Sequence, residues 1–343
     1  MKQLWLYSMR AYLRLGLFFY FKKIEVANAE NIPKNKPVLF LVNHQNALLD
    51  ALLIATKNGR FSYFLTRASV FSKPLVSKIL KSLRMLPVYR IRDGWGNLSK
   101  NNSIFSMSSK LLNEKQAIVI FPEGSHDLRR TVRPLSKGFT RIVFETIEAY
   151  PETELYLIPV GLNFKHATKF SDSTLINFGK PIQVSSNLLD EKNKSVLQLK
   201  DKVSSQLRQL TTHIESDNYE LTLQQLEYLN VDFTNPEDVN KCIASDFNTC
   251  KKITSKQNNF LKQFFKFLLI VNLFVPYLIW KKVIQPKIKE IEFTSTFRFT
   301  IAITLVPIFV ILVMLFLGFV FQIKFAFLYL LNVIVLNLLS VKL

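Results

Sequence analysis

A histidine and an aspartate in the segment NHQNALLD, residues 43–50, are the side chains best suited to acid–base chemistry. His44 follows the apolar run Val38–Val42, and Asp50 lies six positions after it. A carboxylate beside an imidazole fixes the tautomer of the ring and stabilises the cation formed when the ring takes a proton from a hydroxyl. Six residues rotate a helix by ~600°, or ~240° net, so the two side chains can meet only if His44 lies in the turn before the helix. The spacing alone leaves a capping or core role open.

Two further segments are suited to binding an anion. Arg90 and Arg92 follow an apolar segment, Leu-Pro-Val in RMLPVYRIR, which we expect to form a turn. Arginine donates two parallel hydrogen bonds to a phosphate. In FPEGSH, residues 121–126, Gly124 permits a tight turn whose amides, with that of Ser125, could bind an anion. Each segment alone is common on protein surfaces. Together with His44, at the ends of separate strands, they indicate a base beside a phosphate pocket.

Two other histidines lie away from these segments. His166 follows an apolar strand in FKHATKF without an evident partner, and His213 lies within an amphipathic helical pattern. For both we expect a solvated or locally hydrogen-bonded imidazole rather than a catalytic one.

Short apolar runs alternate along the chain with segments of helical spacing. The expected strands are Val38–Val42, Phe61–Leu65, Ala117–Phe121 and Leu155–Val160, and the expected helices are Ala47–Ala55, Phe71–Leu83, Ile104–Leu112 and Gly138–Tyr150. This order predicts an α/β domain with a mostly parallel central sheet flanked by helices. Ligands of such sheets gather at the carboxyl ends of the strands.

The domain is expected to cover residues 24–214. Apolar residues spaced three or four apart from Val196 to Ile214 predict a last helix that closes or covers it. The polar stretch 215–258, with Asn235-Pro236, is typical of a partly helical connector.

Composition adds a membrane region, residues 259–343. The chain has 343 residues, of which 49% are apolar and 20% charged, with a net charge of +20, so a disordered chain is excluded. The uncharged run Phe299–Phe321 is long enough to cross a bilayer. The shorter run Phe325–Leu339 pairs with it as a transmembrane hairpin if the flanking lysines extend to the interface. The run Phe267–Trp280, broken by Asn272 and Pro276, suits a re-entrant or interfacial helix.

The charges near these runs predict an orientation. Five basic residues lie between the runs Phe267–Trp280 and Phe299–Phe321: Lys281, Lys282, Lys287, Lys289 and Arg298. The positive-inside rule places them, and the catalytic domain if residues 267–280 do not cross, on the cytoplasmic face.

Residues 1–23 are expected to form an amphipathic helix that lies in the membrane interface, with Lys22 and Lys23 near lipid phosphates. Arg10 and Arg14 share one face, opposite Trp5 and other apolar side chains, and they interrupt the apolar core that a cleaved signal peptide would need. An ordinary amphipathic helix packed on the body is the alternative.

The chain has two cysteines, Cys242 and Cys250, without a CxxC pair or a histidine cluster. They predict neither a disulfide scaffold nor a zinc site, and we expect two reduced, inward-facing thiols. The sequence contains no metal-ligand set and no dinucleotide-binding glycine motif, so we expect neither a metal nor a cofactor.

The segments NHQNALLD, LPVYR, FPEGSHD and IPVGLNF resemble, in this order, the four signature blocks of the glycerolipid acyltransferases. This family includes bacterial and eukaryotic 1-acylglycerol-3-phosphate acyltransferases. The similarity covers roughly residues 35–182 and includes the closing INFGKPI. It implies transfer of a fatty acyl group from a thioester, acyl-CoA or acyl-ACP (acyl carrier protein), to a glycerol hydroxyl, without a covalent acyl-enzyme.

The resemblance also implies roles for individual residues. His44 would be the base that deprotonates the acceptor hydroxyl, with Asp50 to orient it. Arg90 would bind the acceptor phosphate. The same pocket would be shaped by Glu123, Gly124 and Ser125, and the acyl donor would pass Pro159.

Two departures from the commonest family pattern concern the acceptor. Five residues rather than four separate His44 from Asp50, and FPEG continues with Ser-His-Asp rather than Thr-Arg. Both features resemble the branch of fungal glycerol-3-phosphate and dihydroxyacetone-phosphate acyltransferases. His126 would then assist phosphate binding beside Arg129 and Arg130, or be a solvated loop residue. Arg67 and Lys137 are further phosphate contacts or simply exposed basic residues.

The expected function is therefore a membrane-bound 1-acyl-sn-glycerol-3-phosphate acyltransferase that makes phosphatidic acid. The alternatives are sn-1 acylation of glycerol-3-phosphate or dihydroxyacetone phosphate and, in another class, a catalytically silent membrane lipid-binding protein. Anionic membrane lipids are expected partners, because a basic protein at such a surface concentrates anionic substrates. We do not expect nucleic acid as a partner, because no nucleic-acid-binding sequence pattern accompanies the positive charge.

Overall fold

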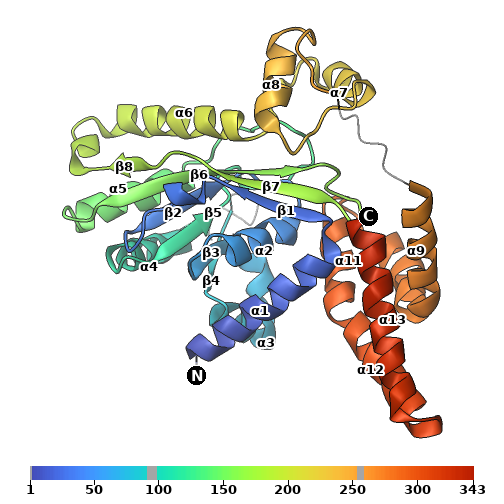
Figure 1. Cartoon of the computed structure of the whole chain (residues 1–343). Coiled ribbons are helices and arrows are strands. Elements are labelled where there is room, and N and C mark those ends of the chain that lie inside the picture. Colours follow the sequence, from blue (N-terminus) through green and yellow to red (C-terminus); the bar gives the residue numbers. More distant parts are fainter. Residues whose placement is uncertain (1, 91–98, 253–258) are drawn as a thin grey trace.

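The computed structural model describes residues 2–90, 99–252 and 259–343, so that Arg92 lies outside the described residues. An eight-stranded sheet forms the centre of the body (Figure 1), with the order β1-β7-β6-β2-β5-β3-β4 and with β8 paired to β6. The strands are β1 (Lys23–Ala27), β2 (Val38–Val42), β3 (Ser62–Arg67), β4 (Met85–Val88), β5 (Ala117–Ile120), β6 (Leu155–Phe164), β7 (Ser173–Phe178) and β8 (Ile182–Val184).

The strands β6, β2, β5, β3 and β4 are all parallel, whereas β7 and β8 are antiparallel to β6. This confirms the predicted α/β class. The helices of the body are α1 (Lys2–Tyr20), α2 (Ala47–Lys57), α3 (Pro74–Ser82), α4 (Asn101–Asn113), α5 (Gly138–Ala149), α6 (Lys192–Leu210), α7 (Tyr219–Tyr228) and α8 (Pro236–Ala244), with short 3-10 turns at Ala29–Asn31, Ala68–Phe71 and Ser186–Leu189.

Two apolar layers sandwich the sheet. Side chains of successive residues of a strand point to opposite faces, so Leu39 and Leu41 pack with α4, α5 and α6, while Phe40 packs with α1 and α2. All five residues of β2 are buried, which explains why its sequence VLFLV is apolar throughout rather than alternating.

The structure corrects several details of the sequence prediction. Leu86 and Pro87 were expected in a turn but belong to β4, and the strands β1, β7 and β8 were not expected at all. The helix expected up to Ile214 ends at Leu210, so His213 lies after it. Its imidazole Nδ1 accepts a hydrogen bond from the amide of Val132 at 3.0 Å.

The stretch expected as a connector holds α7 and α8 and an apolar cluster of its own, centred on Leu226, Val239 and Cys242. Val231 pairs with Lys252 in an isolated β-bridge that closes this unit.

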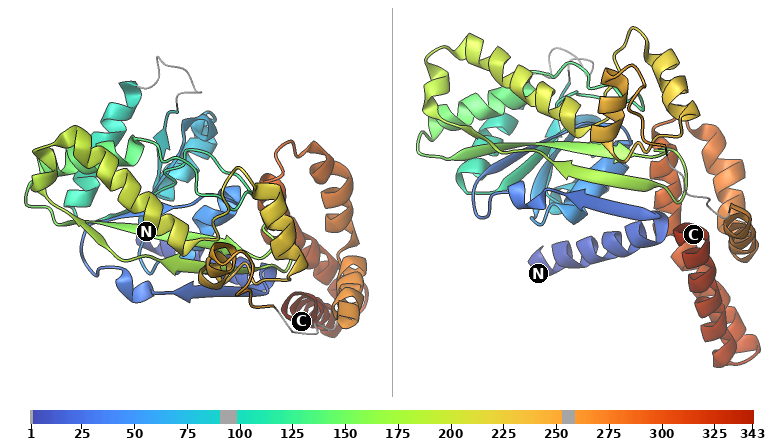
Figure 2. Two further views of the ribbon diagram at one scale, coloured as in Figure 1. Left: turned by 90° about the horizontal axis from the view of Figure 1, so that it is seen from above. Right: turned by 45° about the horizontal axis from the view of Figure 1, so that its top comes forward.

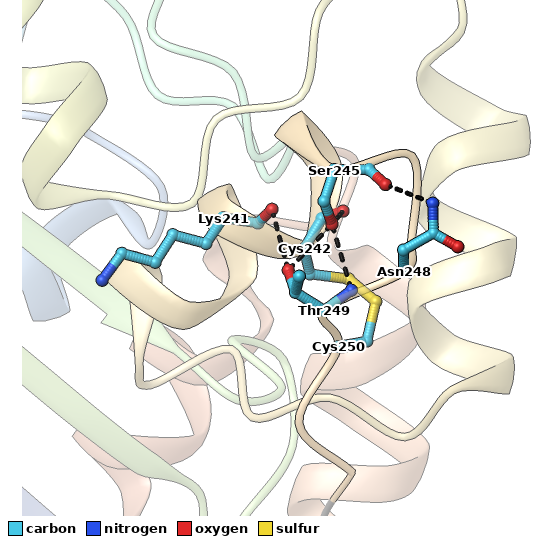
Figure 3. Close-up of a disulfide and its surroundings, with 6 residues drawn as sticks. All are labelled: Lys241, Cys242, Ser245, Asn248, Thr249 and Cys250. Carbon is cyan, nitrogen blue, oxygen red and sulfur yellow. Dashed lines mark hydrogen bonds between the residues drawn. A yellow bond between two sulfur atoms is a disulfide. The ribbon is translucent and has the colours of Figure 1, made fainter.

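The two cysteines form a disulfide, contrary to the prediction of reduced thiols (Figure 3). After α8 the chain reverses through Asp246 and Phe247, which both have positive φ, and this reversal places the two Cα atoms 4.6 Å apart. Thr249 fixes the return, because its hydroxyl donates to the carbonyl of Lys241 and its amide to Ser245 Oγ. Sequence spacing alone does not reveal such a turn.

The carboxyl-terminal region is a group of helices beside the body: α9 (Asn259–Asn272), α10 (Phe274–Leu278), the π-helical turn η6 (Ile279–Ile284), η7 (Gln285–Lys287), α11 (Phe293–Ile303), α12 (Leu305–Val320) and α13 (Ile323–Lys342). Two helices among the described residues are long and apolar enough to cross a membrane, Phe293–Val320 and Ile323–Lys342. The pair Phe260–Asn272 and Phe274–Lys287 is bent by 100°, as in a broken span or a re-entrant loop.

Helices α12 and α13 extend from the body as a hairpin whose two body-side ends are α11 and the carboxyl terminus (Figures 1 and 2). Helix α1 lies on the sheet face that adjoins this hairpin. It contacts α2 and the residues after it through its basic side, since Arg14 donates to the carbonyl of Thr56 in α2 and Arg10 to that of Arg60.

We predict that Gly161→Ala disrupts the packing of α6 on β6. A Cβ atom at this position would lie 2.2 Å from the carbonyl oxygen of Leu210, which is backbone and cannot rotate away. The expected loss is about 2–3 kcal/mol in the free energy of unfolding, measured by denaturation of the detergent-solubilised protein. Gly138→Ala is the matched control, because its nearest heavy atom would be 3.7 Å away. Equal stability of the two variants would contradict this packing.

Candidate active site

The turn between β2 and α2 brings His44 and Asp50 together. His44 Nδ1 lies 2.8 Å from Asp50 Oδ2, and the same oxygen accepts the amides of Gln45 and Asn46, also at 2.8 Å. Asp50 belongs to the first turn of α2 and is fully buried. His44 thus lies in the turn before the helix, the one placement that the spacing permitted.

Three contacts hold this turn on the sheet. The side chain of Asn43 donates to the carbonyl of Leu162 and accepts its amide, which ties the end of β2 to β6. The side chain of Asn46 donates to the carbonyl of Ala167 at 2.7 Å. Ala47 has a φ of 43°, in the left-handed region, and the chain reverses there into α2.

The His44 ring lies between two residues of the loop after β5. It stacks on Phe121 with ring centroids 4.0 Å apart, and the edge of His126 faces it at 5.6 Å. The amide of Asp127 donates to the carbonyl of His44. Behind this contact is a small cavity lined by Asn43, His44, Gln45, Glu123, Asp127, Arg129, Thr131, Val132, Thr211 and Thr212.

A buried ion pair organises the loop after β5. The guanidinium of Arg133 donates to Glu123 Oε2 and also to Ser125, through its hydroxyl at 2.7 Å and its carbonyl. Glu123 is 3% exposed, and burial raises the pKa of this carboxyl although the Arg133 charge acts in the opposite direction. Its negative charge is therefore stable only because Arg133 lies against it.

Gly124 has a φ of 76°, as the expected tight turn requires. Its amide donates to the carbonyl of Phe121 within the turn, so the structure does not support the prediction that this amide serves an anion. Arg90, just after β4, reaches the same loop, with its Nη1 3.5 Å from the Gly124 carbonyl oxygen. Arg90 and His44 therefore flank one loop.

Three further residues predicted for the site, Arg67, Lys137 and Pro159, belong to other elements. Arg67 ends β3 opposite Val88 and is exposed, and exposed Lys137 precedes α5. Pro159 is buried in β6 opposite Leu41 of β2. Within the described residues, none of these three side chains forms a hydrogen bond or ring contact with His44, and none lines the cavity beside it.

Arg130 is not available to a phosphate, contrary to the sequence prediction. Its guanidinium donates to the carbonyls of Phe164 and Lys165 and stacks on Phe233, and burial lowers its pKa to about 10. Arg129 lines the cavity but stacks on Tyr219.

His126 is held from outside the domain. Its Nε2 lies 2.8 Å from Glu290 Oε2, and its ring contacts Phe293 at 4.8 Å. His126, Glu290 and Glu292 place one nitrogen and two carboxylate oxygens within 4.8 Å of one another, and among the described residues this is the one such group that could hold a metal ion. The two glutamates precede α11.

Residues 23–163 match the family model described as Acyltransferase. This part of the chain, which is less than half of it, is similar to the acyltransferases. The motifs predicted a similar region at roughly residues 35–182, whereas the match begins at residue 23 and ends at Asn163. It includes the first three sequence blocks and the residues IPVGLN of the fourth. A glycerol-3-phosphate O-acyltransferase 1 of Saccharomyces cerevisiae is 32% identical to this chain over 107 residues. These residues make up 29% of this chain and 14% of the relative.

Two bacterial proteins are also similar to this chain. A 1-acyl-sn-glycerol-3-phosphate acyltransferase of Borreliella burgdorferi is 28% identical over 148 residues, 43% of this chain and 57% of the relative. The crystal structure of PlsC, the 1-acyl-sn-glycerophosphate acyltransferase of Thermotoga maritima, superposes with a TM-score of 0.40 at 18% identity, covering 60% of this chain and 80% of that one.

Sequence reasoning missed two residues of this site. Arg133, the partner of Glu123, lies beyond the FPEGSH motif in an ordinary basic stretch, RRTVR. A search for the cation that a buried glutamate requires would have pointed to it. Glu290, 164 positions from His126, gave no signal in the sequence.

We predict that Arg133→Met destabilises the α/β domain by about 3 kcal/mol at neutral pH, because it leaves the Glu123 carboxylate buried without its cation. In this variant the folded state binds a proton at Glu123 more tightly than the unfolded state does. The free energy of unfolding should therefore fall as the pH rises from about 5 to 8. Thermal unfolding across this range measures the effect. Adding Glu123→Gln should restore part of the stability and remove the pH dependence, and an unchanged pH dependence would refute the pairing.

Proposed function

We propose that the chain is a membrane-bound glycerolipid O-acyltransferase that uses an acyl thioester. The observation that carries the proposal is the Asp50–His44 pair, 2.8 Å apart, at the end of β2 in a domain of the acyltransferase family. Arg90 supports it further, since this cation reaches the loop on which the His44 ring is stacked.

The arrangement suits general-base catalysis. With Nδ1–H donated to Asp50, the neutral ring carries its lone pair on Nε2, which takes the proton of the acceptor hydroxyl. The hydroxyl oxygen attacks the thioester carbonyl carbon, the C–O bond forms and the C–S bond breaks. The proton then passes from His44 to the departing thiolate. Asp50 stabilises the imidazolium in between.

The proposed acceptor is 1-acylglycerol-3-phosphate, with phosphatidic acid as the product. A named relative of Borreliella burgdorferi acylates this compound, and the chain covers more of that protein than of the yeast relatives. Glycerol-3-phosphate is the second candidate, because the name of the yeast relative carries it and because FPEG continues here as Ser-His-Asp. In both, Arg90 would bind the phosphate. The donor is acyl-CoA or acyl-ACP.

We further propose that the hairpin α12–α13 crosses the membrane and that α1 and α3 lie in its interface. The exposed apolar side chains of these two helices support this: Leu4, Trp5, Tyr12, Leu15 and Phe18 of α1, and Leu75, Val76 and Ile79 of α3. Trp5 donates to Ser82 of α3, so the two helices adjoin on the side towards which the hairpin extends (Figure 1). The basic residues between 281 and 298 favour the cytoplasmic face.

We predict that His44→Ala lowers kcat at least ~10³-fold, because it removes the one described imidazole that Asp50 orients. Asp50→Asn should lower it by a comparable factor, since the amide would donate to Nδ1 and force the unreactive tautomer. Release of the free thiol from an acyl thioester in detergent–lipid micelles measures both. Full activity of His44→Ala would refute the base, and an inactive parent would favour the silent lipid-binding alternative.

A competition assay identifies the acceptor. One labelled acyl thioester is offered with equimolar glycerol-3-phosphate and 1-acylglycerol-3-phosphate, and labelled phosphatidic acid is the expected product. Arg90→Gln should raise the KM of the acceptor ~10-fold or more with a smaller change for the donor, because a charged hydrogen bond to the phosphate is lost. Labelled 1-acylglycerol-3-phosphate as the main product would instead assign the first acylation step.

A further inference from the structure

The segment that leads into α11 contributes a side chain to the active site. Glu290 and His126 are separated by 164 positions, yet Glu290 Oε2 lies 2.8 Å from His126 Nε2. The His126 ring is 13% exposed, whereas Glu290 is 61% exposed. The imidazole is thus enclosed by protein while its carboxylate partner reaches it from the solvent side.

Ring contacts define the position of this imidazole. Its edge faces the His44 ring at 5.6 Å with an interplanar angle of 82°, and it meets Phe293 at 4.8 Å and 79°. His126 therefore lies between the proposed base and the first residue of α11. A rotation of its ring would open one side of the space around His44.

The start of α11 is also anchored to the turn that carries His44. Ser295 Oγ donates to the carbonyl of Ala167 at 2.7 Å, and the same oxygen accepts the side chain of Asn46 at 2.7 Å. Arg298 donates to the next carbonyl, that of Thr168. Two hydrogen bonds on one oxygen connect the active-site turn directly to the apolar helix Phe293–Val320.

We propose that Glu290 is a positioning residue for acyl transfer: it holds His126 against His44, so that the active site is complete only when the leading segment of α11 is docked on the body. The inference rests on the proposed function. A carboxylate on Nε2 fixes the tautomer and the orientation of the ring. Glu290 itself does not contact the substrate, and its effect on the rate passes through His126.

Glu290→Ala releases the His126 ring and should lower kcat by ~10–100-fold, the usual cost of a catalytic group displaced by about 1 Å. The KM of the acyl donor should change by less than ~3-fold, since uniform binding of substrate and transition state is kept. Glu290→Gln keeps an acceptor oxygen without its charge and should fall between Glu290→Ala and the parent. The measurement is steady-state thiol release in mixed micelles.

Glu292→Gln is the matched control. It removes the same charge from the same segment, and in the described part of the chain the hydrogen bond to His126 Nε2 comes from Glu290 and not from Glu292. If Glu290 acts by positioning, Glu292→Gln keeps the parental kcat within ~2-fold. If Glu290→Gln and Glu292→Gln lowered kcat equally, the effect would come from the loss of negative charge near the site and not from positioning of His126, and the proposal would be overturned.

A double-mutant cycle tests whether the effect passes through His126. The double variant His126→Ala/Glu290→Ala should be no slower than His126→Ala alone, within ~2-fold, because residues that act as one unit are not additive. Multiplied losses would mean that Glu290 only supports the fold. An inactive parent overturns both proposals, whereas an active parent, an inactive His44→Ala and a fully active Glu290→Ala overturn this one alone.

Discussion

The structure around the site depends on the buried carboxylate of Asp50. A charge removed from water is stable only when donors surround it. Here one oxygen accepts three hydrogen bonds, from the ring of His44 and the amides of Gln45 and Asn46. The chain can present these donors only by turning tightly between β2 and α2. The orientation of the proposed base therefore follows from the need to satisfy the aspartate.

The parallel sheet then brings the other groups to the same edge. Leu41 lies opposite Ile120 of β5, so the chain leaves β2 and β5 side by side and Phe121 meets the His44 ring. Strand β5 also pairs with β3, and β3 with β4. Residues that follow these strands, among them Arg90, project from one edge although about 46 positions separate Arg90 from His44. The grouping of these residues at one edge is a consequence of strand order.

The sequence predicted those parts that local rules determine. Alternating apolar runs specify β2, β5 and their helices, and the six-residue spacing of His44 and Asp50 implied a turn that the structure contains. The sequence did not predict contacts between segments that are distant along the chain. Three contacts depend on how loops fold back: the Arg133–Glu123 ion pair, the hydrogen bonds of Arg130 to backbone carbonyls, and the Cys242–Cys250 disulfide. The spacing of apolar residues in the sequence does not predict such loop conformations.

The contact of His126 with Phe293 also bears on where a lipid substrate would bind. Phe293 is the first residue of an apolar helix long enough to cross a bilayer, so the ring beside His44 lies where that helix meets the body. An acceptor with one acyl chain could keep the chain among lipids while its glycerol hydroxyl approaches His44, whereas a water-soluble acceptor gains nothing from this position. The placement of His126 and Phe293 is therefore consistent with the proposed lipid acceptor.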